Sequence, residues 1–109
     1  MPKKISFQGL TETDMDLIAA RFRALSEVSR LKLMLAAGSG EINVTQLIAA
    51  TGLSQANVSK HLRNLTASGF LVRRQRGIFV YYSTTDSTFP KLCAMGRSVS
   101  GNAPAGYAE

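Results

Sequence analysis

The stretch of residues 45–82 constrains the fold most, because its cap and turn residues permit few arrangements. It predicts, in order, a helix from Thr45 to about Thr51, a turn at Gly52-Leu53 and a longer helix from about Ser54 to Ser68. Thr45 and Ser54 suit helix starts, since each hydroxyl can accept a hydrogen bond from a free N–H group of the first turn. Gly52 can adopt the left-handed conformation that ends a helix. Two helices joined by a tight glycine turn form a unit whose second helix can enter a DNA major groove.

The second of these helices separates apolar from polar residues. Val58, Leu62 and Leu65 recur at the spacing of one helical face and should pack against the core. The other side carries amide, hydroxyl and cationic groups and no acid, and such groups recognise base edges and bind phosphates. The candidate DNA-binding residues of this helix are Ser54, Gln55, Asn57, Ser59, Lys60 and Arg63.

After Gly69 the pattern changes from helical to alternating. Residues 70–82 place β-branched and aromatic side chains on both sides of an arginine-rich tip, and Gly77 allows a tight return, so a β-hairpin is predicted. Arginine suits a hairpin that lies along phosphates, because its fork can bind two phosphate oxygens at once. A solubilising charged turn is the alternative interpretation. The candidate DNA-binding residues of the hairpin are Arg73, Arg74 and Arg76.

The segment GLSQANVSKHLRNLTASGFLVRRQRGIFVYYS resembles the winged helix-turn-helix of the ArsR (SmtB/ArsR-type) bacterial repressors. The upstream segment ALSEVSRLKLMLAA is also similar to that family, although Val28 stands where proline is common. The similarity spans about residues 15–100. It implies a mainly α fold with a small β-hairpin, comprising about five helices and a two-stranded wing. It also implies a homodimer that binds a palindromic operator on double-stranded DNA.

The charge is concentrated in the same region. From Ile42 to Thr85 the chain has five basic residues and no acid, and the net charge of the whole chain is +6. A basic excess on one module is the electrostatic footprint of nucleic-acid binding. With 109 residues, of which 45% are apolar, the chain should form one small domain.

Composition also bears on the compartment. No stretch approaches 18 consecutive apolar residues, and the N-terminal segment lacks the apolar run of a signal peptide. The single cysteine cannot form an intrachain disulfide, which suits a reducing compartment. We therefore expect a cytoplasmic protein without a membrane partner.

Helical patterns flank the central stretch. The first begins near Thr11 or Thr13 and has acids in its first turn, where the helix dipole favours them. The second runs from about Val28 to Ala37, and Ile42 and Val44 are expected to form a short strand that pairs with the hairpin. These elements should support the central stretch rather than contact DNA.

The first helix and a last helix, expected from near Thr88 to about Ser100, carry apolar stripes that a lone winged helix would not cover. The resemblance implies that these two helices form the interface of the homodimer. The candidate interface residues are Met15, Ile18, Phe22, Phe89, Leu92 and Val99. Residues 1–10 are expected to form a flexible arm, residues 11–100 the domain, and residues 101–109 a disordered tail.

Many proteins of the ArsR family sense metals, so the resemblance requires a check of each ligand position. Metal sensors of the family often have two cysteines where this chain has Asn43 and Thr45, and neither residue is a soft-metal ligand. The other familiar site uses Asp, His and Glu on the last helix, where this chain offers Asp86 and no histidine. We expect no metal and no other cofactor.

The single histidine and the single cysteine each permit two interpretations. The resemblance implies a scaffold role for His61, hydrogen-bonded at the junction of the second helix and the wing, and pH sensing is the alternative. Cys93 is either a small buried hydrophobe or a redox-sensitive thiol at the dimer interface. No base stands beside a nucleophile in the sequence, so we expect no enzymatic activity.

These observations predict a sequence-specific transcriptional regulator, a repressor that lacks the usual metal-sensing sites and responds to an unidentified small-molecule or redox effector. Two alternatives stay open: a repressor that switches through Cys93, and a winged helix used for contact with another protein. A steep loss of DNA affinity with salt would distinguish DNA binding from protein contact.

Overall fold

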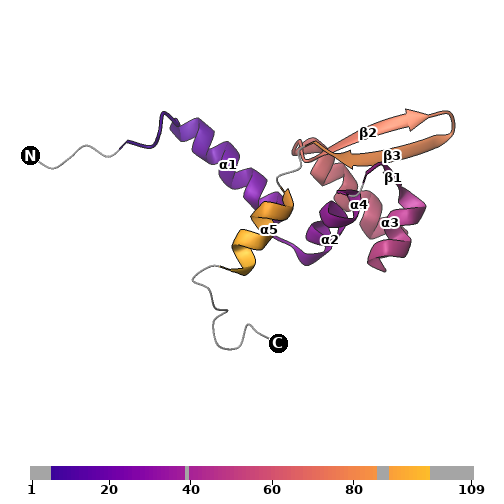
Figure 1. Cartoon of the computed structure of the whole chain (residues 1–109). Coiled ribbons are helices and arrows are strands. Elements are labelled where there is room, and N and C mark those ends of the chain that lie inside the picture. The colour runs from indigo at the N-terminus through magenta and orange to yellow at the C-terminus, as the bar shows by residue number, and fades with distance from the viewer. Residues whose placement is uncertain (1–5, 39, 86–88, 99–109) are drawn as a thin grey trace, which may run out of the picture.

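The structure is a computed structural model that describes residues 6–38, 40–85 and 89–98. In chain order the elements are α1 (Glu12–Leu25), α2 (Val28–Ala37), β1 (Ile42–Asn43), α3 (Val44–Thr51), α4 (Gln55–Ala67), β2 (Leu71–Arg76), β3 (Phe79–Thr84) and α5 (Phe89–Arg97) (Figure 1). The described residues thus contain the five expected helices. No described helix combines the length and the apolar character needed to cross a membrane.

The sheet has three antiparallel strands in the order β1-β3-β2, which are the two strands of the expected wing and the short strand expected to pair with it. Strands β2 and β3 form the hairpin, with Leu71 opposite Thr84 at its base and Arg76 opposite Phe79 near its tip. The third strand is short, and Ile42 lies opposite Tyr82. The predicted pairing of this segment with the hairpin is therefore confirmed, although the strand ends at Asn43 and Val44 begins α3.

The start of α3 explains this difference. Asn43, and not Thr45, is the N-cap: its side chain accepts a hydrogen bond from the Gln46 N–H at 2.8 Å, and the Gln46 side chain accepts one from the Asn43 N–H at 2.9 Å. This reciprocal capping box satisfies two free donors, whereas a cap at Thr45 would have no such partner. The predicted cap at Ser54 is confirmed, and of the two candidates for the first helix, Thr11 and Thr13, Thr11 is the cap.

The core lies between α2, α3, α4 and the sheet. Its fully buried large side chains are Leu33, Met34, Leu47, Val58, Leu62 and Leu65. The predicted apolar face of α4 therefore packs as expected. Gly52 ends α3 with a φ of 72°, the left-handed conformation that the sequence predicts there.

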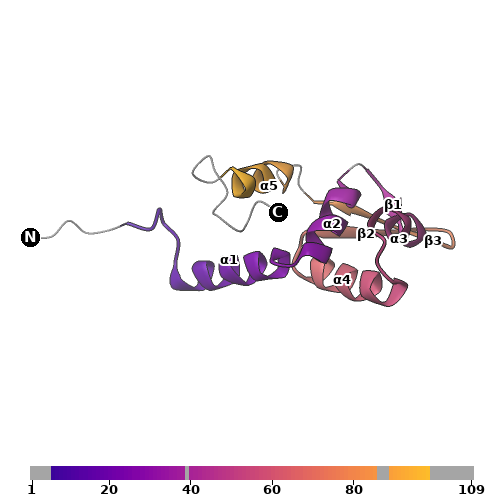
Figure 2. The same ribbon diagram turned by 90° about the horizontal axis from the view of Figure 1, so that it is seen from below.

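Helix α1 extends away from this core and approaches it only near its C-terminal end (Figures 1 and 2). Leu25 is its one buried residue, and Phe22 is 50% exposed. Helix α5 packs beside α2, where Phe89 is buried within its own subunit and Leu92 is half-buried. Val99, also predicted to lie in the dimer interface, lies outside the described residues, as do residues 1–5 of the expected arm and all of the expected tail.

Candidate nucleic-acid interface

Helix α4 buries one face against α2 and α3 and exposes the other. The buried residues are Val58, His61, Leu62 and Leu65. The candidate DNA-binding residues Ser54, Gln55, Asn57, Lys60 and Arg63 are exposed, and Ser59 is half-buried. The helix therefore presents amide, hydroxyl and cationic side chains to solvent without a competing carboxylate of its own.

Two further residues belong to this exposed face. Ala56 and Asn64 are exposed, and Ala56 lies four residues before Lys60, one helical turn away. Helical spacing alone would have placed both residues on the exposed face. Ser54 has a mainly structural position, because its side-chain oxygen accepts a hydrogen bond from the Asn57 N–H at 3.2 Å and so caps the helix.

The three wing arginines do not share one face of the hairpin. Successive side chains of a strand point to opposite faces, so Arg73 lies on the face of the buried Leu71, while Arg74 and Arg76 lie on the other. Cross-strand pairing places Tyr81 opposite Arg74. Residue type alone predicts one role for all three arginines, although the two-residue period of a strand distinguishes them.

Arg76 already has an anionic partner in its own chain. Its Nη2 atom lies 2.6 Å from Oε1 of Glu41, and its guanidinium carbon lies 5.9 Å from the centroid of the Tyr81 ring. The Arg76 side chain is 62% exposed, and pairs this open to solvent contribute only about 0–1 kcal/mol. A phosphate could therefore compete with Glu41, a residue that the sequence analysis missed because only the folded sheet brings it to the wing.

The hairpin tip adds an apolar element that was not predicted as part of the site. Ile78 is 88% exposed and Phe79 is 54% exposed. Apolar side chains at such a tip can contact sugars and base edges in a minor groove. The sequence signal that could have revealed them is an apolar residue directly after the turn glycine Gly77.

His61 contacts Arg30 of α2 and Glu27, the residue that precedes α2. It was expected to form its hydrogen bond at the junction with the wing. Its Nε2 lies 3.2 Å from Oε1 of Glu27, and its Nδ1 accepts a hydrogen bond from Nε of Arg30 at 3.3 Å. Because the arginine side chain has no acceptor, Nδ1 is the acceptor of this bond, and Nε2 is the ring nitrogen that faces Glu27. The expectation failed because His61 lies on the part of the buried face of α4 that packs against α2.

The described residues at the first familiar metal site do not offer a suitable donor set, and Asp86 of the second site lies outside the described residues. Asn43 is engaged as the cap of α3, Thr45 is exposed, and neither provides a thiolate. Among the described residues, no group of three or more His, Cys, Asp or Glu side chains could hold a metal ion. Cys93 is half-buried and packs against the core.

Comparison with known proteins finds relatives of the region that contains α2, α3 and α4. A sequence model described as "Bacterial regulatory protein, arsR family" matches residues 27–72. The chain is 39% identical over 62 residues to an arsenic resistance transcriptional regulator of Pseudomonas putida, and the match covers 56% of this chain and 54% of that protein. The chain thus spans about half the length of that relative.

A longer match is to a probable mercury resistance operon repressor of Streptomyces lividans. The two are 32% identical over 90 residues, which cover 83% of this chain and 72% of the repressor. These relatives are named as regulators and not as enzymes, in agreement with the expectation of no enzymatic activity.

The fold matches a solved structure from Mycobacterium bovis, a homodimeric winged helix-turn-helix DNA-binding domain of a possible ArsR-family regulator. The TM-score is 0.69 at 24% identity, and the match covers 92% of this chain and 90% of that domain. At this identity the likeness concerns the fold alone. The order of helices and strands, the sequence model and the Streptomyces repressor agree, and the chain belongs to the ArsR family of bacterial regulatory proteins.

Proposed function

We propose that the protein is a transcriptional regulator that binds double-stranded DNA through α4 and the hairpin. The observation that carries this proposal is the exposed face of α4, where free amide, hydroxyl and cationic side chains stand without an acid. The hairpin projects beyond the helices, so it can reach a groove next to the one that α4 enters (Figure 1).

The two elements have different roles in this proposal. Gln55, Asn57, Ser59 and Lys60 lie in the first half of α4, the end that usually meets base edges, and so recognise sequence. Arg63 lies further along the exposed face of α4 and contacts the phosphate backbone of the DNA. Arg73 and Arg74 contact phosphates from the hairpin, and Arg76 does so by exchanging Glu41 for a phosphate.

We propose that the active form is a homodimer that binds a palindromic operator. Met15 and Ile18 are half-buried, and Phe22 remains half-exposed on a helix that its own subunit covers little. A second copy related by a two-fold axis would cover this stripe and that of α5 around Leu92. For such a dimer to read two half-sites on one face of the DNA, its two α4 helices must lie about 34 Å apart, one turn of DNA.

We further propose that the protein represses transcription and does not sense soft metals at the two familiar sites. Resistance to arsenic and mercury belongs to the relatives, and the thiolate ligands are missing from this chain at Asn43 and Thr45. A redox role for Cys93 would require oxidation of a half-buried thiol. No observation favours it over the role of a small hydrophobe.

The test is selection of binding sites from a random duplex library, followed by binding isotherms over a salt series. We expect selected sites to contain two inverted half-sites about ten base pairs apart, and the logarithm of affinity to fall linearly with the logarithm of salt. A winged helix used for protein contact would bind no duplex at about 50 mM salt, and that result would contradict the proposal.

A further inference from the structure

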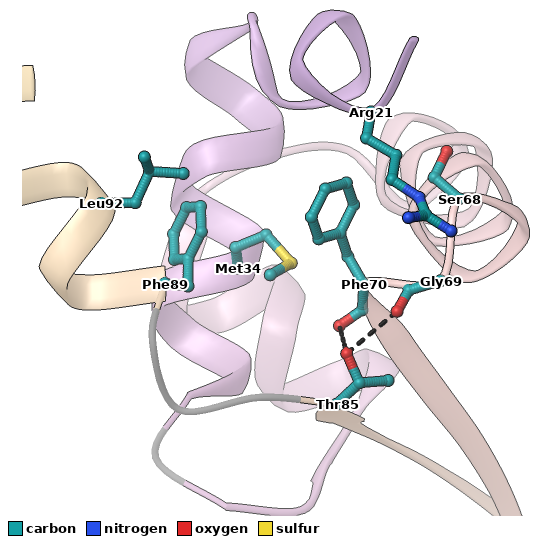
Figure 3. A pocket seen from close by; sticks show the side chains of 8 residues that line it. All are labelled: Arg21, Met34, Ser68, Gly69, Phe70, Thr85, Phe89 and Leu92. Carbon is teal, nitrogen blue, oxygen red and sulfur yellow. Dashed lines mark hydrogen bonds between the residues drawn. The ribbon is translucent and has the colours of Figure 1, made fainter. Parts of the chain in front are cut away.

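Three hollows in the surface meet at Arg21, where α1 and α5 approach the end of α4. The largest has a volume of about 290 Å³ and lies between α5 and the joint of α4 with β2 (Figure 3). Its neighbours have volumes of about 270 and 190 Å³. No residue assigned above to DNA binding lines any of them, so these hollows are separate from the nucleic-acid interface.

The largest hollow, hereafter the Arg21 pocket, combines an apolar wall with one cation. Phe70 and Phe89 lie on either side of Met34, and Leu92 lies beside Phe89 (Figure 3). The Arg21 side chain reaches from α1 past Phe70 toward the end of α4 (Figure 3). Two aromatic rings and a guanidinium therefore line one pocket, with Phe70 between Met34 and Arg21 in this view.

The polar groups at the base of the Arg21 pocket are largely satisfied. The Thr85 hydroxyl lies 2.9 Å from the Gly69 carbonyl oxygen and 3.3 Å from the Phe70 carbonyl oxygen, to which it can donate. The Phe70 carbonyl also accepts a hydrogen bond from the Thr85 N–H at 3.1 Å. Among the described residues, these bonds leave the Arg21 guanidinium and the Ser68 hydroxyl as the free polar side-chain groups of the pocket.

Arg21 has no counter-ion among the described residues, whereas Arg30 and Arg76 each have one. A guanidinium beside apolar walls favours a planar oxyanion, because its parallel N–H groups match the two oxygens of a carboxylate. The aromatic walls favour a flat apolar body, since ring pairs gain from offset or edge-to-face packing. Both requirements are met by one small molecule.

We infer that the Arg21 pocket binds a small aromatic carboxylate, whose carboxylate pairs with Arg21 and whose ring packs against Phe70, the aromatic side chain beside Arg21 (Figure 3). The size is suitable: a cavity of about 150 Å³ can hold benzene, so about 290 Å³ can hold one ring with a short acidic side chain. The base of the pocket is Gly69–Phe70, which joins α4 to the wing. A bound acid would thus touch the joint between both proposed DNA-contacting elements.

The test is calorimetric titration of the full chain with phenylacetate at neutral pH. We expect saturable binding with a dissociation constant of about 1 mM or lower, which is modest for ten non-hydrogen atoms. Arg21→Gln should weaken binding at least about tenfold, because it removes a charge-assisted, two-point contact. The matched control is Arg23→Gln, which removes the same charge from the same helix at an exposed residue that lines none of the three hollows.

Two ligand controls keep the test independent of any folding defect in the variants. Phenylacetamide, which lacks the charge, and acetate, which lacks the ring, should each bind wild-type protein at least about tenfold more weakly. Absence of saturable binding below about 10 mM phenylacetate would overturn the inference. This result is expected if a second copy of the chain fills the pocket. Equal binding by Arg21→Gln, by the amide or by acetate would also overturn it. DNA binding by the ligand-free protein is measured separately, so the two proposals can fail independently.

Discussion

The winged-helix module, which comprises α2, α3, α4 and the sheet, differs from the flanking helix α1 in how completely it is packed. In the module, the apolar face of α4 is buried and its polar face is free. In α1, Leu25 is the one buried residue, and Leu17 and Phe22 remain about half exposed. The module therefore buries its apolar residues in its own core, while α1 has an apolar surface that its subunit does not cover.

Because of this difference, an apolar side chain contributes differently to stability in the two regions. A buried residue of the module contributes to stability of the subunit, because its removal leaves a cavity that neighbours fill only in part. An exposed apolar residue of α1 contributes little until a second copy or a ligand covers it. Substitutions in the two regions should consequently affect different measurements, and the following experiments test that separation.

The largest effect is expected for Leu62→Ala in the module. Leu62 is 1% exposed, so the substitution should lower the free energy of unfolding by about 2–5 kcal/mol. Urea unfolding followed by circular dichroism, at one fixed protein concentration, measures the change. The concentration must be fixed because association shifts apparent stability. A loss below about 1 kcal/mol would show that the module core is not as tightly packed as its burial indicates.

Phe22→Glu should disrupt the dimer without unfolding the module. The side chain is 50% exposed in the subunit, so a charge there costs the monomer little, whereas a dimer would have to bury it twice. We expect the dimer dissociation constant, measured by sedimentation equilibrium, to rise at least about a hundredfold. Thr13→Glu, at an exposed position away from the apolar stripe, is the control and should leave the constant unchanged. A Phe22→Glu protein that remains dimeric would remove α1 from the proposed interface.

Gln55→Ala and Arg74→Ala should separate sequence recognition from phosphate binding. Gln55→Ala is expected to cost about 1–3 kcal/mol on the selected site and little on a scrambled duplex. Arg74→Ala should weaken both duplexes and reduce the salt slope by about two for a dimer that loses one phosphate contact per subunit. Binding isotherms of both variants over one salt series provide the measurement. If Arg74→Ala lost only specific binding, at an unchanged slope, the hairpin would be the element that recognises bases.

The smallest effect is expected for Glu41→Gln, which removes the charge that holds Arg76. Because the pair contributes only about 0–1 kcal/mol in each subunit, affinity for any duplex should rise by no more than about thirtyfold in the dimer. Fluorescence anisotropy with a labelled random duplex at low salt is sensitive enough for this change. Arg76→Ala and the double variant complete a cycle in which Glu41→Gln should have no effect once Arg76 is absent. A gain of affinity that persists without Arg76 would place the action of Glu41 elsewhere.

The sequence determined the features of this protein that depend on residues close together in the chain. The glycine turn at Gly52, the cap at Ser54, the apolar face of α4 and the return at Gly77 all follow from local conformational preference and periodicity. The absence of acids between residues 42 and 85 could also be seen without coordinates. Even the wrong cap at Thr45 was a local error of two residues, because the Asn43–Gln46 capping box was present in the sequence.

The tertiary structure alone decided which distant residues meet. Glu41 reaches Arg76 because β1 and β2 flank the same strand, and His61 reaches Glu27 and Arg30 because α4 packs across α2. The Arg21 pocket likewise combines side chains from α1, α2, α5 and the joint of α4 with the hairpin. Periodicity shows which face of an element is apolar, but it does not show which other element covers that face. That choice depends on the simultaneous packing of all the elements, and it fixes the partners of every buried or half-buried polar group.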